Sequence, residues 1–233
     1  LERGAFLLRA LDDPAAGRYD ALAARMRAIA RPNASKQATA LQVLAGMADP
    51  AAANASVLAV DPFRGLSTFY GYYVLQARAA AGDIDGCLEL IRTYWGGMLD
   101  MGATSFWEGF EIDWMENATG IDEMPEPGRP DIHADFGDHC YVGLRHSLCH
   151  GWAAGPTAWL SEWVLGVRVA ADDQGVRVTV APNLGRLDWA RGSVPTPAGV
   201  VTVAHRRWHD GTVETEIDAP DGVTIAGGTE TDR

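Results

Sequence analysis

One carboxylate of the chain lies inside a run of aromatic residues. In MGATSFWEGFEIDW, residues 101–114, Glu108 directly follows Trp107 and precedes Phe110. A carboxylate among aromatic rings is typical of a cleft in which the rings contact a ligand and the acid exchanges a proton. A lone glutamate can equally be a first-turn helix residue that interacts favourably with the helix macrodipole. The sequence therefore leaves two interpretations of Glu108, a catalytic group and a solvated helix end.

Further aromatic and titratable residues are candidates for the same site. Sugar rings have apolar C–H faces that stack on indole and phenol rings, although core packing explains most tryptophans equally well. The residues that we predict to line a pocket are Trp107, Trp114, Trp152 and Tyr73. His150, in SLCHGW, is either a histidine bonded to a carbonyl or a donor to a ligand. Its neighbour Cys149 is not expected to form a Cys-His nucleophile with His150, because adjacent helical side chains point about 100° apart.

The acids near Glu108 and in the next loop form no recognised metal site. Asp113 and Glu116 are candidate second carboxylates, but their spacing is more typical of a solvated helix face. The polar segment DIHADFGDHCY contains Asp131, His133, Asp135, Asp138 and His139. No known ligand spacing is satisfied there, so a solvated loop is the simpler interpretation. The sequence predicts neither a metal nor a cofactor.

The composition excludes several classes of function. The 233 residues are 47% hydrophobic, which is enough for a folded core. A formal charge of −12 opposes binding to nucleic acid, and the 19 Lys and Arg residues form no basic cluster. No apolar run approaches the roughly 20 residues that cross a bilayer. The three cysteines, Cys87, Cys140 and Cys149, suit neither a disulfide framework nor a zinc site, and we expect them to be reduced and mostly buried.

Hydrophobic periodicity predicts helices followed by strands. Apolar residues recur at helical spacing in antiparallel pairs as far as residue 165, and Ser35 and Asp83 are expected to begin two of these helices. Beyond Gly166 the period changes to two, and Asp210-Gly211 is typical of a hairpin. The sequence thus predicts an α+β chain of more than one domain, helical over residues 1–165 and antiparallel β over 166–233.

Three segments follow one another along the chain. They are MLDMGATSFWEGF, SLCHGWAAGPTAWLSEWVLGVR and VAPNLGRLDWARGSVPTPAGVVTV. Together they resemble the C-terminal half of bacterial α-L-rhamnosidases and related glycoside hydrolases. The resemblance covers nearly the whole chain. It implies an (α/α)6 barrel of six helical hairpins around a sugar pocket, with a small β-sandwich behind it. Residues 1–165 would be the later part of that barrel, residues 166–233 the sandwich, and earlier hairpins would precede Leu1.

The resemblance also implies roles for individual residues. In this family the Gly-Ala-Thr-(Thr/Ser)-x-Trp-Glu motif carries the general base, which is Glu108 here, and His150 lies near the pocket. Inverting hydrolysis requires a second carboxyl about 6.5–9.5 Å away as general acid. The family's acid lies in an earlier D-x-x-x-R-x-E/D motif followed by tryptophan, and this chain contains no such motif.

Two functions follow from the resemblance. The first is inverting hydrolysis of terminal α-L-rhamnosides, with the acid supplied by a missing N-terminal half or by another chain, so that these 233 residues alone would be inactive. The second is a non-catalytic carbohydrate-binding or scaffold module derived from such a hydrolase. Both imply a carbohydrate partner.

Overall fold

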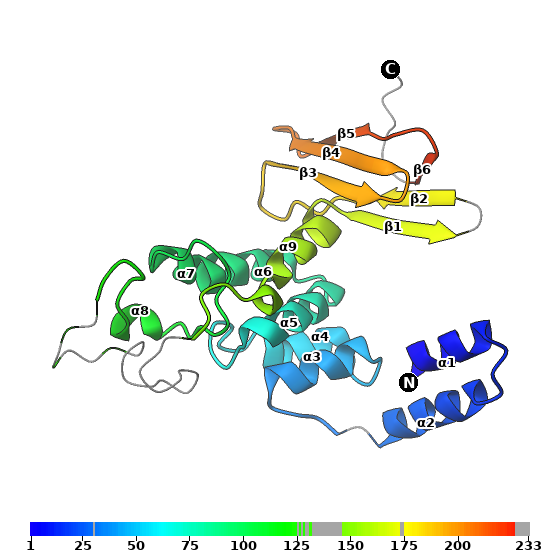
Figure 1. The fold of residues 1–233 in the computed structure, drawn as a ribbon, viewed down its shortest axis with the longest axis horizontal. Helices are drawn as coiled ribbons and strands as arrows, with labels where there is room; N and C mark the ends of the chain where they lie inside the picture. The colour runs from blue at the N-terminus through cyan, green and yellow to red at the C-terminus, as the bar shows by residue number, and fades with distance from the viewer. Residues whose placement is uncertain are drawn as a thin grey trace.

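The computed structural model describes residues 1–29, 31–124, 126, 128, 131, 146–172 and 175–226. In this part, helices precede two three-stranded sheets (Figure 1). The helices are α1 (Glu2–Ala10), α2 (Ala16–Ala28), α3 (Lys36–Leu44), α4 (Pro50–Ala53), α5 (Thr68–Ala80), α6 (Ile84–Leu90), α7 (Gly96–Asp100), α8 (Trp114–Asn117) and α9 (Gly155–Trp159). The strands are β1 (Val167–Asp172), β2 (Gly175–Val180), β3 (Trp189–Thr196), β4 (Gly199–Arg207), β5 (Val213–Asp218) and β6 (Val223–Ala226).

Side-chain caps set the predicted helix starts. Ser35 accepts a hydrogen bond from the amide of Ala38 at the start of α3, and Asp83 accepts one from Gly86 at the start of α6. Both predicted N-caps are confirmed. Gly82 ends the preceding helix with a φ of 81°, a conformation that favours glycine.

Three of the helices continue into single π-helical turns. These turns are Asn54–Leu58, Ile91–Trp95 and Leu160–Val164. The second joins α6 to α7, which makes one long helical segment (Figure 1). A turn of 3-10 helix, Gly151–Ala153, precedes α9.

Helices α3 to α9 share one hydrophobic core. Its largest fully buried side chains include Trp107, Trp159, Tyr94 and Phe110. The buried guanidinium of Arg78 is held by Asp83, with its Nη2 2.7 Å from Asp83 Oδ2. The carboxylate that caps α6 therefore also neutralises a cation inside the core.

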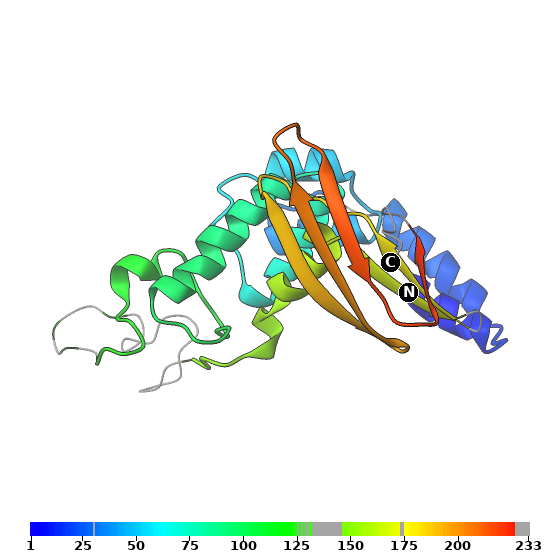
Figure 2. The same ribbon diagram turned by 90° about the horizontal axis from the view of Figure 1, so that it is seen from above.

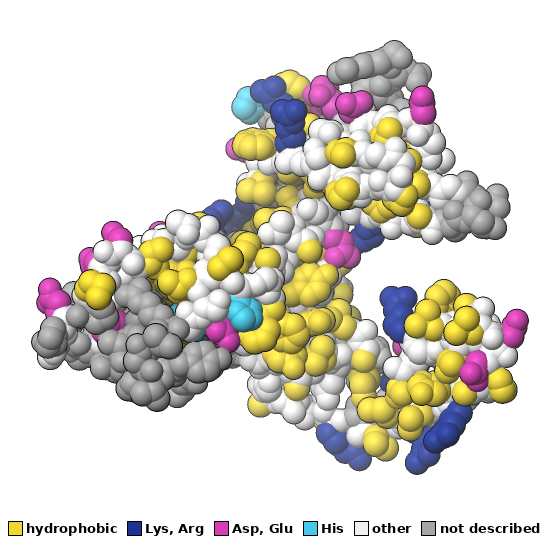
Figure 3. Space-filling view, in the orientation of Figure 1, with side chains coloured by type: hydrophobic (Ala, Val, Ile, Leu, Met, Phe, Trp, Pro, Cys, Tyr) yellow, Lys and Arg dark blue, Asp and Glu magenta, His cyan; other side chains and the backbone are white. Residues whose placement is uncertain are grey.

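The first two helices pack on each other and lie apart from this core (Figures 1 and 2). Their outward side chains include Phe6, Leu7, Leu11 and Ile29, each more than half exposed. Figure 3 shows hydrophobic side chains on the surface of the pair. Among the residues that the structure describes, the helices form pairs but do not close into a barrel (Figure 1).

The two sheets have the strand orders β1-β2-β6 and β3-β4-β5. Valines of β2 and β4 that were predicted to alternate do so, and Val178 and Val203 are fully buried in a core shared by both sheets. The hairpin predicted at Asp210-Gly211 joins β4 to β5, with Gly211 at a φ of 86°.

The expectation of an entirely antiparallel β region is wrong for one pair of strands. Strand β6 pairs in parallel with β2, with Val178 opposite Ile225. After β5 the chain crosses from one sheet to the other, so β6 joins the first sheet in the direction of β2. The other three strand pairs are antiparallel.

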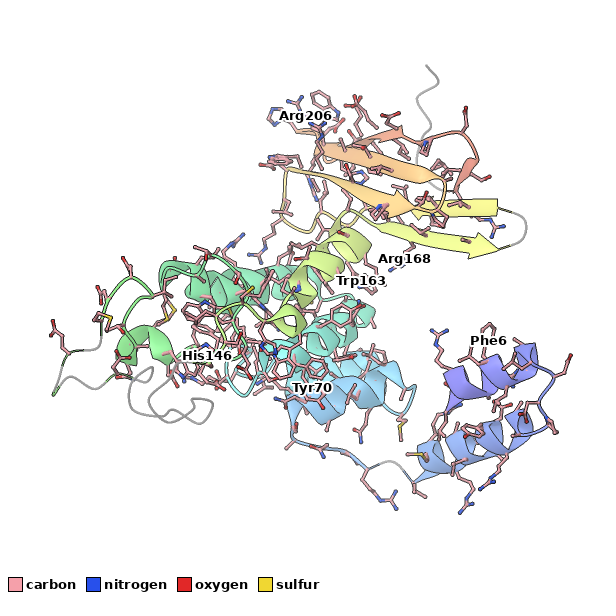
Figure 4. All side chains as sticks on the ribbon, viewed as in Figure 1. Phe6, Tyr70, His146, Trp163, Arg168 and Arg206 are labelled. Atoms are coloured by element: carbon pink, nitrogen blue, oxygen red, sulfur yellow. The ribbon has the colours of Figure 1, made fainter. Side chains whose placement is uncertain are left out.

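A compact junction connects the helical region to the sheets. Gly166 has a φ of 71°, and a Cβ there would lie 2.0 Å from the carbonyl oxygen of Ala181. The ring of His205 bridges Leu165 O at 2.9 Å and Thr215 Oγ1 at 2.8 Å. On the other side, the guanidinium of Arg168 lies 4.9 Å from the ring centre of Trp163 (Figure 4).

Candidate functional site

Glu108 lies at a bend in an irregular segment between α7 and α8. Its amide donates to Ser147 O at 2.9 Å, and the amide of Ser147 donates to Glu108 Oε2 at 3.0 Å. Two residues away, the amide of His150 donates to Phe106 O at 2.8 Å. Residues 105–108 and 147–150 therefore run antiparallel to each other, which fixes one carboxylate oxygen against a backbone amide. The interpretation of Glu108 as a first-turn helix residue is wrong, because the segment is not helical.

The main chain of Glu108 is held from two further sides. Its carbonyl oxygen accepts a hydrogen bond from the hydroxyl of Thr68 and one from Trp152 Nε1 at 3.0 Å. Thr68 is 2% exposed and is the first residue of α5, directly after the N-cap Ser67. The start of α5 and the turn before α9 thus position the same residue, whose side chain remains half-buried.

A group of aromatic rings continues outward from Trp152, whose indole bonds to the backbone carbonyl of Glu108. The ring centres of His150 and Trp152 are 4.2 Å apart, and Trp152 lies 5.7 Å from Phe69. Phe69 in turn contacts Tyr70 at 4.9 Å and Tyr73 at 5.8 Å. We call these five residues the aromatic surface. Its α5 side is marked by Tyr70 in Figure 4.

This surface is accessible. Trp152 is 48% exposed and Phe69 is 38% exposed, while the other three rings are partly buried. Three of the residues predicted for the site, Tyr73, His150 and Trp152, therefore lie in one continuous group of rings. Its link to Glu108 is the hydrogen bond from the Trp152 indole.

Trp107 and Trp114 lie elsewhere, which corrects the expectation that they face a ligand. Trp107 is 0% exposed and packs edge-on against Phe110, with ring centres 6.3 Å apart. Trp114 is 5% exposed and lies 5.2 Å from the ring of His146. Trp107 is therefore enclosed in the core, whereas the side chain of its neighbour Glu108 is half-buried.

The other acids near Glu108 have structural partners. Asp113 forms an exposed ion pair with Arg64. Asp131 is 1% exposed and accepts a hydrogen bond from Thr119 Oγ1 at 2.6 Å. The remaining residues of the acidic loop, His133, Asp135, Asp138 and His139, lie outside the described residues. In the part of the chain that is described, no group of three or more His, Cys, Asp or Glu side chains could hold a metal ion.

The cysteines differ from one another. Cys87 is buried, and burial raises the pKa of its thiol to about 12. Cys149 is exposed, so the expectation of buried cysteines is wrong for this residue. Both thiols are free, and Cys140 lies outside the described residues.

Sequence reasoning missed the residues that hold Glu108 in place. Thr68 and Ser147 are 40 and 39 positions from Glu108 and contact it through a hydroxyl and an amide. From the sequence alone, Phe69 and Tyr70 can be recognised only as members of a predicted helix rich in aromatic residues. A useful signal would have been the clustering of Phe69, Tyr70 and Tyr73 directly after a serine N-cap.

None of the described helices is long and apolar enough to cross a membrane.

Comparisons with known proteins agree with this architecture. Residues 167–226 match the family described as the bacterial alpha-L-rhamnosidase C-terminal domain. Among solved structures, a GH78 family rhamnosidase of Bacillus sp. GL1 superposes with a TM-score of 0.66 and 25% sequence identity. The match covers 93% of this chain and 23% of that protein. No curated protein sequence matches the chain.

These matches support a glycoside hydrolase lineage. Residues 167–226 are similar to the C-terminal domain of bacterial α-L-rhamnosidases, and the chain as a whole is similar to part of a solved rhamnosidase. It spans about a quarter of the length of the solved rhamnosidase that it matches.

Proposed function

We propose that this chain is part of an inverting glycoside hydrolase of the α-L-rhamnosidase type and that Glu108 is its general base. The observation that carries the proposal is the position of the Glu108 carboxylate. It is half-buried, oriented by the amide of Ser147, and its backbone carbonyl is bonded to the indole of an accessible aromatic surface. A carboxylate held in this way can orient one water molecule beside a stacked sugar.

In the proposed reaction, Glu108 takes a proton from a water molecule whose oxygen attacks the anomeric carbon. The glycosidic bond breaks on the opposite face of the ring, and its oxygen takes a proton from a general acid. In inverting enzymes the two carboxyls are about 6.5–9.5 Å apart, which leaves room for the water. The acid would come from a part of the protein outside these 233 residues, where the remaining hairpins of the barrel would also lie.

The aromatic surface would bind the sugar. Trp152 and Tyr73 offer ring faces to the apolar side of a rhamnoside, and His150 offers a hydrogen-bonding nitrogen beside them. Trp107 and Trp114 would support the site from the core, because neither has an accessible face in this chain. The sugar would therefore contact residues from α5 and from the turn before α9.

A non-catalytic carbohydrate-binding module is the alternative. The observation that favours it is the accessible aromatic surface, which would bind a sugar whether or not Glu108 activates water. Such a module would use the same aromatic surface, and Glu108 would then accept hydrogen bonds from sugar hydroxyls instead of activating water.

Kinetics with the complete polypeptide separate these functions. Glu108→Gln keeps an acceptor for the Ser147 amide but cannot accept a proton from water, so hydrolysis of an aryl α-L-rhamnoside should fall about 10²–10⁴-fold or more. Glu116→Gln, at an exposed position in α8, is the matched control and should keep full activity. NMR of the first product should show the inverted, β anomer.

Unchanged turnover in Glu108→Gln would rule out the catalytic role. Rhamnoside binding without hydrolysis by the wild-type complete polypeptide would establish the binding module instead.

A further inference from the structure

A recess lies on the sheet β3-β4-β5, away from the segment that contains Glu108 (Figure 1). It is a recess of about 710 Å³ lined by Asp188, Trp189, Arg206, Arg207, Trp208 and His209. Figure 4 labels Arg206 at the left end of the sheet, well away from Tyr70 in the helical region. Figure 3 shows basic, histidine and hydrophobic side chains together at this end. The residues come from the start of β3 and from the end of β4 with the loop that follows it.

Strand register brings the principal side chains onto one face. Trp189 of β3 pairs with Arg206 of β4, and Arg206 pairs with Glu214 of β5. Directly paired residues point to the same side of a sheet. The buried neighbour His205 points to the other side, so these three residues face outward.

Two indoles are presented in this recess. Trp189 is 68% exposed and Trp208 is 44% exposed, whereas Trp107 and Trp159 in the helical core are both 0% exposed. Exposed tryptophans grouped around a recess mark a binding surface more often than a packing accident.

The site is partly preorganised by its own contacts. The guanidinium of Arg206 lies 4.6 Å from the ring centre of Trp208, and Trp208 Nε1 donates to Glu214 Oε2 at 3.2 Å. The amide of Trp208 also donates to Thr212 O at 2.9 Å, which closes the hairpin loop. A stacked guanidinium keeps its N–H edge available for a carboxylate, because the donors lie in the plane of the group.

The charge of the recess differs from that of the chain. The chain carries a formal charge of −12, whereas the two arginines of the recess balance Asp188 and the adjacent Glu214. An anionic ligand would therefore be repelled less here than at the rest of the surface.

We propose that this recess is a second carbohydrate-binding site, specific for oligosaccharides that carry a carboxylate. Trp189 stacks on the apolar face of a sugar ring, and Arg206 binds the carboxylate of a uronic acid residue. The ligand class follows from the indole and guanidinium chemistry of the recess and does not depend on a catalytic role for Glu108.

Calorimetric titration of the complete polypeptide with trigalacturonate, and with its neutral methyl ester as the matched ligand, tests this proposal. We expect trigalacturonate to bind about tenfold more tightly than the ester and to lose affinity as salt is raised. Trp189→Ala and Arg206→Gln should each weaken trigalacturonate binding about tenfold. Val200→Ala removes exposed apolar surface at the other end of β4, where Val200 is 58% exposed, and should leave this binding unchanged.

Equal affinities for the acid and its ester, binding that survives both variants, or no binding at all would overturn the proposal. Protection of Trp189 from hydroxyl-radical oxidation in the complete polypeptide without saccharide would also overturn it, since another segment of the protein would then occupy the recess. Circular dichroism identifies a variant that fails to fold, and the comparison of the two ligands on the wild type remains decisive in that case.

Discussion

Helix α5 carries a glycine whose replacement should disturb both the core and the candidate site. A Cβ on Gly71 would lie 2.6 and 2.9 Å from two ring carbons of Trp95. Ordinary carbon contacts are about 3.5–4.0 Å, so the ring would have to move by roughly 1 Å. Trp95 is 5% exposed, and its Nε1 donates to Ala153 O at 3.0 Å. The ring therefore has little room to move without loss of that bond.

The expected cost of Gly71→Ala follows from two opposing effects. Alanine should stabilise the helix by about 1 kcal/mol relative to glycine. Overpacking of a filled core costs about 1–3 kcal/mol, and a weakened buried hydrogen bond costs about another 1 kcal/mol. We expect a net destabilisation of about 1–3 kcal/mol, or a fall in Tm of roughly 2–12 °C for a chain of this size.

Gly96→Ala is the matched control. Gly96 lies at the start of α7, where an added Cβ meets nothing within 4 Å. The same substitution should therefore raise the free energy of unfolding by about 0.5–1 kcal/mol. Equilibrium denaturation of both variants by urea measures the difference. Equal or greater stability of Gly71→Ala than of the wild type would refute the packing described for Trp95.

Three further outcomes are expected. Burial lowers the pKa of His205, so its neutral form stabilises the fold above the ordinary pKa of about 6.5, and this stability is lost as pH falls through the lower pKa of the folded state. His205→Gln should therefore weaken the pH dependence of thermal unfolding. A pH profile identical to that of the wild type would contradict this expectation. In urea denaturation, Trp107→Ala should lower the free energy of unfolding by about 3–5 kcal/mol and Trp152→Ala by less than about 1 kcal/mol, because only Trp107 is fully buried. Similar losses of stability in the two variants would contradict this difference in burial. A thiol reagent should modify Cys149 in the native protein and should leave Cys87 unmodified until the protein unfolds. Peptide mass spectrometry measures the labelling of each cysteine. Labelling of Cys87 in the native protein would contradict its burial.

Local signals in the sequence predicted much of the fold. Ser35 and Asp83 are short polar residues that can bond to free amides, and both cap helices as expected. The alternation at Val176, Val178 and Val180 predicted a strand with one buried face, which β2 has. These features depend on neighbours within a few residues, so the sequence contains the information directly.

Other features depend on contacts that no local pattern records. The parallel pairing of β6 with β2 is set by where the chain crosses between sheets. The position of the Glu108 carboxylate depends on the amide of Ser147, 39 positions away. An indole is suited equally to a core and to a sugar surface, which is why Trp107 and Trp152 could not be distinguished from their residue type.

The role of Glu108 as general base can be tested most directly by chemical rescue. In the complete polypeptide, Glu108→Gly removes the carboxylate, so no group beside the sugar can activate water. Azide needs no proton abstraction and can attack the anomeric carbon in its place, while the aryl alcohol leaves. If Glu108 is the general base, azide should restore turnover of an aryl α-L-rhamnoside, and NMR should identify the product as the β-rhamnosyl azide. No rescue by azide, or an azide of the α configuration, would contradict the account.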